Sequence, residues 1–389
     1  MKKTVRFFNT FSPVVPLYED FSAPLLRRGI QPRFLISQGW YRNSSDDMAV
    51  EGGGCFERCW FPKALRESKR MSSVFYYAMA PIILLFRKAD LHVFLTQPPL
   101  FFLVGAFLSR LKGVPYGIHL MDMYPDLLVA IGLLKEKGLF YRLLNRMAVN
   151  TYQKADFVVV LGRCMRDRLI EKGVPADKIH IVHNWSVIPP STKLRINNSY
   201  REKWGLGSKL VVMYAGNIGI AHDMAPLLEA ARQLRAYNDI VFVIVGEGIG
   251  RKAVEGFVQR YSLKNVLLRD SQPVANLDEL VSSADIHYVT LKAGYEGLMV
   301  PSKLYSILAC GSPVLFMGSK RSEVARILEQ YRCGILCGSE SSCIVRYIKR
   351  AMHDRSWLEE YGSNAVTAAN DVSKEKMIKR YIAIIEGEE

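Results

Sequence analysis

Short apolar runs rich in β-branched and aromatic residues alternate with longer stretches of helical periodicity along the whole chain. Five runs in the first half predict strands: 4–8, 32–37, 91–96, 116–121 and 157–161. Four longer stretches predict helices between them: 17–28, 72–87, 100–111 and 139–154. Segment 39–62 interrupts this alternation and holds three successive glycines, so we expect a loop there.

The second half repeats this alternation of strands and helices. Its predicted strands are 210–214, 241–245, 266–268, 286–290, 314–316 and 334–336. Its predicted helices are 224–237, 252–261, 276–283, 303–310 and 323–330. Segment 356–386 is helical in pattern, with no strand after it. Strands and helices in this order indicate an α/β protein with two parallel, doubly wound sheets.

The length of 389 residues is too great for one ordinary core and fits two domains of about 150–200 residues each. The polar stretch 188–207, which contains two adjacent prolines, is the expected linker. We therefore expect a first domain over 1–187, a linker over 188–207 and a second domain over 208–355. The remaining residues, 356–389, are expected to form C-terminal helices.

Composition narrows the class of protein. Hydrophobic residues make up 49% and charged residues 23%, which is typical of a globular chain. The formal net charge of +15 favours an anionic partner, such as nucleic acid, a lipid surface or a phosphorylated substrate. The seven cysteines lack the spacing of a zinc site, which favours reduced thiols in the cytoplasm. Because no apolar run approaches the ~20 residues of a membrane-spanning helix, we expect a cytoplasmic protein, free or peripherally attached to a membrane.

Three segments of the second half place a turn directly after a predicted strand. Residues 214–219 read YAGNIG, residues 245–248 read VGEG, and residues 296–314 read EGLMVPSKLYSILACGSPV. Gly216 and Gly219 allow a tight turn and a close backbone approach to a ligand. The last segment opens a helix, whose first N–H groups and partial positive charge suit a phosphate.

These three segments, in this order and spacing, resemble the donor-binding half of bacterial family 4 glycosyltransferases of the GT-B fold, from the branch that builds surface polysaccharides such as O-antigen, capsule and colanic acid. The resemblance implies two Rossmann-like domains facing a cleft, with a C-terminal helix crossing back to the first domain. It also implies a retaining transfer of a sugar from a nucleotide diphosphate sugar, with UDP favoured, to a polyprenyl-diphosphate-linked glycan. No cofactor is expected. No metal is expected either, because the chain lacks the Asp-x-Asp pair that another glycosyltransferase fold uses.

The resemblance assigns the phosphate contacts residue by residue. Gly216, Asn217 and Gly219 would lie beside the donor phosphates and sugar, and Gly246 belongs to the neighbouring turn. The residues that start the later helix would hold the diphosphate: Pro301, Ser302, Lys303 and Leu304. Lys303 would add a positive charge there, unless it is a surface lysine that pairs elsewhere.

The nucleobase and the ribose complete the donor contacts. Gln272 and Pro273 match the loop on which relatives seat the base. Most of the wider family binds the ribose with the second glutamate of an E-x7-E pair, but this chain has Leu298 and Ser306 at those two positions. Glu296 is the nearby carboxylate.

The basic pair that usually steadies the leaving diphosphate is also absent after Gly219. His222 and Lys303 are the candidates to replace it.

In the first domain, residues 117–126 read GIHLMDMYPD at the end of a predicted strand, similar to a segment that faces the cleft in relatives. Asp122 is the candidate base or orienting group for the acceptor, and His119 a candidate donor contact. The alternatives are a helix cap for Asp122 and a core position for His119. Asp126 is expected to cap the helix that follows Pro125.

Basic residues flank the two apolar helices predicted over 72–87 and 100–111: Arg66, Lys69, Arg70, Arg87, Lys88, Arg110 and Lys112. This pattern favours attachment to the anionic inner face of the plasma membrane, although both helices could simply be core layers. Two other functions stay open. A GT-B UDP-sugar 2-epimerase would need clustered acidic and histidine side chains, and a basic nucleic-acid-binding protein would need a recognition module, which the sequence does not show.

Overall fold

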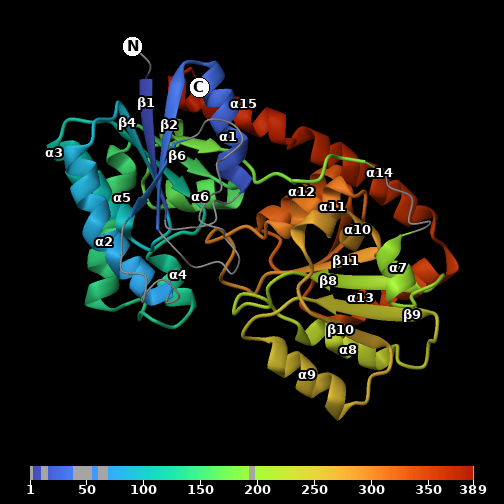
Figure 1. Cartoon of the computed structure of the whole chain (residues 1–389). Helices are drawn as coiled ribbons and strands as arrows, with labels where there is room; N and C mark the ends of the chain where they lie inside the picture. The colour runs from blue at the N-terminus through green and yellow to red at the C-terminus, as the bar shows by residue number, and fades with distance from the viewer. Residues whose placement is uncertain (1–2, 10–15, 38–54, 60–68, 192–197, 389) are drawn as a thin grey trace. The chain divides into compact units, whose positions relative to one another are not determined.

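The computed structural model describes residues 3–9, 16–37, 55–59, 69–191 and 198–388. The chain forms two compact units. Unit 1 comprises Met1–Val182 together with Ile378–Glu389, and unit 2 comprises His183–Met377. Figure 1 shows a sheet flanked by helices in each of them.

Unit 1 is built on a parallel sheet of seven strands in the order β3-β2-β1-β4-β5-β6-β7. Their bounds are β1 Lys3–Phe8, β2 Ile30–Ser37, β3 Cys55–Cys59, β4 Leu91–Leu95, β5 Tyr116–Leu120, β6 Phe157–Val160 and β7 Ile179–Ile181. Every residue of β4, β5 and β6 is buried, as expected for parallel strands covered on both faces. The helices of this half are α1 Pro16–Arg27, α2 Lys69–Phe86, α3 Phe101–Leu111, α4 Asp126–Ala130, α5 Leu139–Lys154 and α6 Arg163–Glu171.

Unit 2 contains a parallel sheet of six strands in the order β10-β9-β8-β11-β12-β13. Its strands are β8 Leu210–Ala215, β9 Ile240–Val245, β10 Val266–Arg269, β11 Ile286–Thr290, β12 Val314–Met317 and β13 Gly334–Gly338. Its helices are α7 Ser199–Lys203, α8 Ala225–Gln233, α9 Arg251–Arg260, α10 Leu277–Ser282, α11 Lys303–Ala309, α12 Glu323–Tyr331, α13 Ser341–His353 and α14 Ser356–Asp371. A core of aliphatic and aromatic side chains from β8, β9, α8 and α13 fixes one face of this sheet.

The last helix, α15 (Lys374–Glu386), begins in unit 2, and its residues from Ile378 onward belong to unit 1. There the Lys3 ammonium donates a 2.7 Å hydrogen bond to the carbonyl oxygen of Ile385. The Tyr381 ring is fully buried, with its centroid 4.6 Å from that of Phe21. Unit 1 is therefore completed by the end of the chain, as the expected return of a C-terminal helix requires.

All eleven predicted strands are present to within a few residues, and β3 and β7 are additional. The expectation of a loop throughout 39–62 was wrong at Cys55–Cys59, which pairs in parallel with β2. A short edge strand with charged residues in its centre, CFERC, carries little strand signal. The rest of that segment lies outside the described residues.

The sequence prediction also missed helices α6, α7 and α13. The opening residues of α13, SSCIV, favour a strand as much as a helix. Within the described part of the chain, no helix is both long enough and apolar enough to cross a bilayer.

Candidate functional site

The strand order of unit 2 creates a reversal point between β8 and β11. From β8 the chain proceeds outward through β9 to β10, and it then returns to the other side of β8 as β11. In open α/β sheets, the loops at the carboxyl ends of two such strands separate and leave a ligand-binding crevice. The YAGNIG segment forms the end of β8 and the start of the loop after it. That loop stays next to β11, because the Tyr288 hydroxyl donates to the Asp223 carbonyl oxygen at 2.7 Å.

The two glycine-containing loops of unit 2 pack directly against each other. The Ile218 N–H donates to the Glu247 carbonyl oxygen at 2.7 Å, and the Gly250 N–H donates to the Ile218 carbonyl oxygen at 3.0 Å. A Cβ atom at Gly246, where φ is +129°, would lie 2.2 Å from the Gly216 carbonyl oxygen. The glycine of the second loop is therefore required by the backbone of the first loop.

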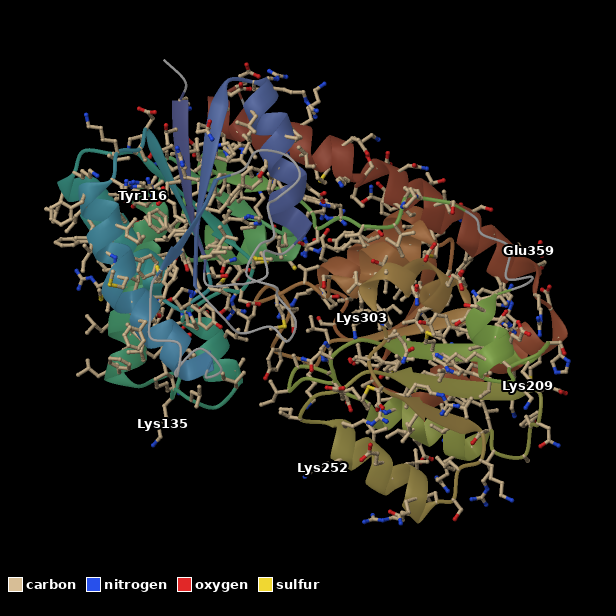
Figure 2. The ribbon with its side chains drawn as sticks, in the orientation of Figure 1. Tyr116, Lys135, Lys209, Lys252, Lys303 and Glu359 are labelled. Atoms are coloured by element: carbon tan, nitrogen blue, oxygen red, sulfur yellow. The ribbon has the colours of Figure 1, made fainter. Side chains whose placement is uncertain are left out.

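Lys303 is the first residue of α11, and its side chain reaches back to the loop after β8 (Figure 2). Its ammonium nitrogen lies 3.6 Å from the centroid of the Tyr214 ring, and a Cβ atom added to Gly216 would be 3.2 Å from it. Among the described residues, this buried nitrogen has no hydrogen-bond partner. Burial lowers the pKa of Lys303 to about 7. A buried amine held only against an aromatic face has unused capacity for an anion.

His222 holds the turn at Gly219. The Gly219 N–H donates to Nδ1 of His222 at 3.0 Å, so in the neutral ring the proton is on Nε2. Burial, followed by the charges of Lys303 and Lys292, lowers the pKa of His222 to about 4. His222 is thus neutral at physiological pH and offers an N–H donor rather than a second positive charge.

The start of α11 exposes Ser302, whose side chain makes no capping hydrogen bond. Leu304 is fully buried, and its N–H donates to the carbonyl oxygen of Pro301 at 3.3 Å. The helix therefore presents the N–H groups of Ser302 and Lys303 at its first turn.

Glu296 has local partners in its own loop. It accepts a 2.7 Å hydrogen bond from the Gly294 N–H, and its carboxylate lies 3.8 Å from the Arg321 guanidinium. Ser306, at the position of the family's second glutamate, accepts a 3.4 Å hydrogen bond from the Ser186 hydroxyl.

The loop expected to seat the nucleobase follows β10. The Gln272 side-chain amide donates to the Asp270 carbonyl oxygen at 2.8 Å, and Pro273 precedes a single 3₁₀ turn, Val274–Asn276. Its strand lies two strands from β8, so these residues are apart from the cluster formed by Gly216 and Lys303.

In unit 1, Asp122 follows the carboxyl end of β5, and its N–H donates to the Thr96 hydroxyl at 3.1 Å. Burial raises the pKa of Asp122 to about 6, against the opposing effect of a hydrogen bond with Gln97. A carboxyl group with a pKa near neutrality suits proton transfer. His119 is buried with its ring centroid 5.3 Å from that of Tyr381, and burial lowers its pKa to about 4.

The expectation that Asp126 caps a helix was wrong. Pro125 occupies the N-cap of α4, and Asp126 lies in the first turn with its carboxylate buried. That carboxylate accepts from Arg168 at 3.0 Å and from Lys172 at 2.9 Å. Two cations from α6 and the residue after it therefore bind Asp126, which is a structural ion pair.

The structure brings one group of predicted residues together in unit 2: Gly216, Asn217, Gly219, Gly246 and Lys303. Sequence reasoning missed Tyr214, whose ring lies beneath the lysine and whose hydroxyl donates to the Asn217 carbonyl oxygen at 2.7 Å. The signal was present, because Tyr214 is the aromatic residue of the YAGNIG segment itself.

Comparison with known proteins assigns both halves of the chain. Residues 18–185 match the glycosyl transferase 4-like domain, and residues 197–367 match the glycosyl transferases group 1 domain. The chain is 27% identical over 353 residues to WcaI of Escherichia coli K12, named as a colanic acid biosynthesis glycosyl transferase, covering 87% of this chain and 85% of the relative. It is 28% identical over 261 residues to WbjE of Pseudomonas aeruginosa, described as a glycosyltransferase, covering 64% and 63%.

Among solved structures, the chain resembles Alr3699/HepE of Anabaena in complex with UDP-glucose. The TM-score is 0.75 at 16% identity, over 99% of each chain, which shows a common fold. The predicted GT-B fold is thereby confirmed, as is the predicted family. The chain belongs to the bacterial family 4 glycosyltransferases of the GT-B fold.

Proposed function

We propose that this enzyme transfers a sugar from a nucleotide diphosphate sugar, with UDP the favoured nucleotide, to a polyprenyl-diphosphate-linked glycan, with retention of the anomeric configuration. The reaction would serve surface polysaccharide synthesis at the inner face of the plasma membrane, where the protein is peripherally bound. WcaI is named for colanic acid biosynthesis, and HepE has been solved with UDP-glucose, which supports this choice of pathway and donor.

The observation that carries the proposal is the environment of Lys303. Its amine is buried beside Gly216 without a hydrogen-bond partner among the described residues, at the reversal point of the sheet. A diphosphate bound there would keep the ammonium charged. The N–H groups at the start of α11 would supply further donors to the same anion.

Bond cleavage in this proposal needs stabilisation of the leaving group. The bond from the anomeric carbon to the diphosphate oxygen breaks, and the nucleoside diphosphate leaves with its electron pair. Lys303 and the Nε2–H of His222 stabilise that developing negative charge. The acceptor hydroxyl forms the new bond on the same face of the sugar, and its proton passes to the Asp122 carboxylate or to the departing phosphate.

The two other functions that the sequence left open have less support. An epimerase needs several acids and histidines around one sugar, but within unit 2 the nearby carboxylate of Glu296 is bonded to Gly294 and close to Arg321. A nucleic-acid-binding role is not needed to explain a chain that belongs to a glycosyltransferase family.

The donor site is tested by calorimetry with UDP, GDP and dTDP on the full chain. Lys303→Met and Ser302→Glu should each weaken binding of the preferred nucleotide by about 100-fold, because one removes a cation and the other adds a repelling carboxylate. Lys209→Met is the matched control, since Lys209 is exposed and lies at the opposite end of β8 (Figure 2). Unchanged affinity in Lys303→Met and Ser302→Glu would refute this position for the diphosphate.

A further inference from the structure

Helix α5 presents apolar side chains to solvent along one stripe. Leu139 is 83% exposed and Phe140 61% exposed, and Leu143 and Met147 continue the same face one and two turns later. The outward stripe of a helix on a water-exposed surface is normally polar. An exposed apolar face of this kind indicates contact with another apolar phase.

Two neighbouring helices of unit 1 also expose apolar side chains to solvent. Their exposed apolar residues are Val74, Tyr77, Ile82, Leu85 and Phe86 on α2, and Val104, Phe107 and Leu111 on α3. Helix α3 packs against both α2 and α5, and the Phe102 ring of α3 stacks on Tyr152 of α5 with centroids 5.4 Å apart. Figure 1 shows the three helices on the same side of unit 1. We call this surface the α2–α3–α5 face.

The charged side chains of the three helices that form the α2–α3–α5 face all have a positive sign. The sequences of the three helices contain no aspartate or glutamate. Four basic residues of α3 and α5 are exposed on it: Arg110, Arg142, Arg146 and Lys154. The adjoining loops add exposed Arg87, Lys88, Lys135 and Lys137, against exposed Asp90, Glu136 and Asp156. A positively charged apolar surface is complementary to an anionic lipid bilayer.

A groove of about 510 Å³ lies between α3 and α5. Its walls are mainly apolar, with Leu103, Phe107 and Met147, and the basic side chains of Arg110 and Lys154 also line it. Tyr116, labelled in Figure 2, is also one of the lining residues, and its hydroxyl donates to the Thr151 carbonyl oxygen at 2.9 Å. Apolar walls next to cations match an acyl chain next to an anionic headgroup.

We propose that the α2–α3–α5 face docks on an anionic phospholipid bilayer, with α5 as its main contact and the α3–α5 groove facing the lipid. This inference rests on the proposed function, since a lipid-linked acceptor is reached from such a surface. The membrane contact predicted from the sequence rested on basic residues at the ends of α2 and α3. The proposed contact differs from it, because it adds α5 with Arg142 and Arg146. Of the residues in that expectation, Arg66 and the side chains of Lys69 and Arg70 lie outside the described residues.

The same observations disfavour a second copy of this chain as the occupant. Pairing two identical faces would bring arginines of α3 and α5 against each other without a carboxylate from these helices to neutralise them. A bilayer supplies the missing negative charge through its phosphates. The apolar stripes can also enter the boundary between headgroups and acyl chains.

The test is co-sedimentation of the full chain with vesicles of phosphatidylglycerol and phosphatidylcholine, compared with phosphatidylcholine alone. We expect binding to the anionic vesicles only, weakening as salt rises above about 0.15 M, where the Debye length is about 8 Å. The combined change Arg110→Gln, Arg142→Gln and Arg146→Gln should lower the partition coefficient by about 100-fold. The apolar variant Leu139→Ser, Phe140→Ser and Leu143→Ser should also lose most binding.

A matched control removes the same charge from unit 2. Lys252→Gln, Arg260→Gln and Lys264→Gln neutralise three exposed cations on and after α9, of which Figure 2 labels Lys252. Vesicle binding should change less than about twofold. UDP affinity measured on every variant separates a failed membrane face from a failed donor site. Equal loss in the α9 control, wild-type binding by the arginine variant, or a dimer that the Leu139→Ser, Phe140→Ser and Leu143→Ser variant dissolves would each overturn the proposal.

Discussion

The helices that cover the two sheets differ in what they present to water. Helix α13 of unit 2 buries Ile344, Ile348 and Ala351 and exposes mainly basic and polar side chains, as an ordinary surface helix does. Helix α5 of unit 1 buries Ala148, Thr151 and Tyr152 near its end and exposes Leu139 and the apolar residues that follow it. Both helices flank a parallel sheet, so the difference comes from their amino-acid sequences and not from the architecture.

This difference indicates that the two units contact different kinds of ligand. In unit 2 the specialised chemistry is at the strand ends, where glycines and a buried lysine can hold a water-soluble anion. In unit 1 the outer layer of helices exposes apolar and basic side chains, which suit the surface of a lipid bilayer. The proposed reaction, with a soluble donor and a lipid-linked acceptor, needs both. The following predictions separate the two units experimentally.

The largest expected effect is a loss of turnover when Asp122 of unit 1 is changed. Asp122→Asn should reduce turnover by about 10²- to 10⁴-fold, the range typical of a lost proton-transfer group, while UDP affinity stays unchanged. Because burial raises the pKa of Asp122 to about 6, the wild-type rate should fall as the pH drops below 6 and the carboxylate becomes protonated. Steady-state rates at several pH values, with calorimetry on the same samples, check both statements. A near-normal rate would leave Asp122 a structural role only.

The second prediction concerns a change that should impair nucleotide binding by unit 2 and leave unit 1 unaffected. Gly246→Ala places a Cβ atom 2.2 Å from the Gly216 carbonyl oxygen in a backbone with φ of +129°, so the first glycine loop must move. UDP affinity should fall by about 100-fold, and vesicle binding should not change. Gly256→Ala on α9 is the control, because a Cβ there meets nothing within 4 Å and should stabilise the helix by up to about 1 kcal/mol. Normal UDP binding by Gly246→Ala would contradict the packing of the two loops.

A smaller effect is expected from pH on donor binding. The pKa of Lys303 is lowered to about 7 in the empty site, and a bound diphosphate should raise it, so binding above pH 7 takes up a proton. UDP affinity should therefore fall as pH rises above 7, by up to about tenfold per pH unit. The terminal phosphate of a nucleotide titrates near pH 6 and His222 near pH 4, so neither obscures this range.

Calorimetry in two buffers of different ionisation enthalpy measures the proton uptake directly. Lys303→Met should bind more weakly and show no pH dependence above 7. A pH dependence retained in this variant would assign the titration to another group.

The smallest expected effect is on the free energy of unfolding, and it compares helix α5 with helix α13. Leu143→Ala on α5 should change the free energy of unfolding by no more than about 0.5 kcal/mol, because the side chain is already exposed to water. Ile348→Ala on α13 should cost about 2–5 kcal/mol, since it leaves a cavity in a packed core. Chemical denaturation of both variants without lipid gives the two values. A large cost at Leu143 would mean that the helix face is covered in solution.

The sequence predicted the two sheets well because their central strands are continuous apolar runs, such as FVVV in β6 and IVFVIV in β9. It indicated the glycine-containing turns of unit 2 because glycine, proline and lysine occur there in a recognisable order, and their role in donor binding stays a prediction. Tyr214 stood out as the aromatic residue of YAGNIG, but its contact with the Lys303 ammonium could not be predicted, because it depends on where the tertiary fold places the start of α11. Asp126 was misread for the same reason: its cations come from around α6, more than forty residues later. The outward direction of the α5 stripe also needed the structure, because periodicity shows a stripe but not which way it faces.

The composition of unit 1 from both ends of the chain has a consequence for biosynthesis. Residues up to Val182 emerge from the ribosome almost two hundred residues before Ile378–Glu389, a delay of roughly 10–40 s at about 5–20 residues per second. During that time Phe21 and His119 lack the ring of Tyr381 that covers them in the finished protein. Unit 2 is contiguous and can complete its fold first. Since Lys3 contacts Ile385 directly, a circular permutant that joins residues 378–389 to the front of unit 1 would remove the delay.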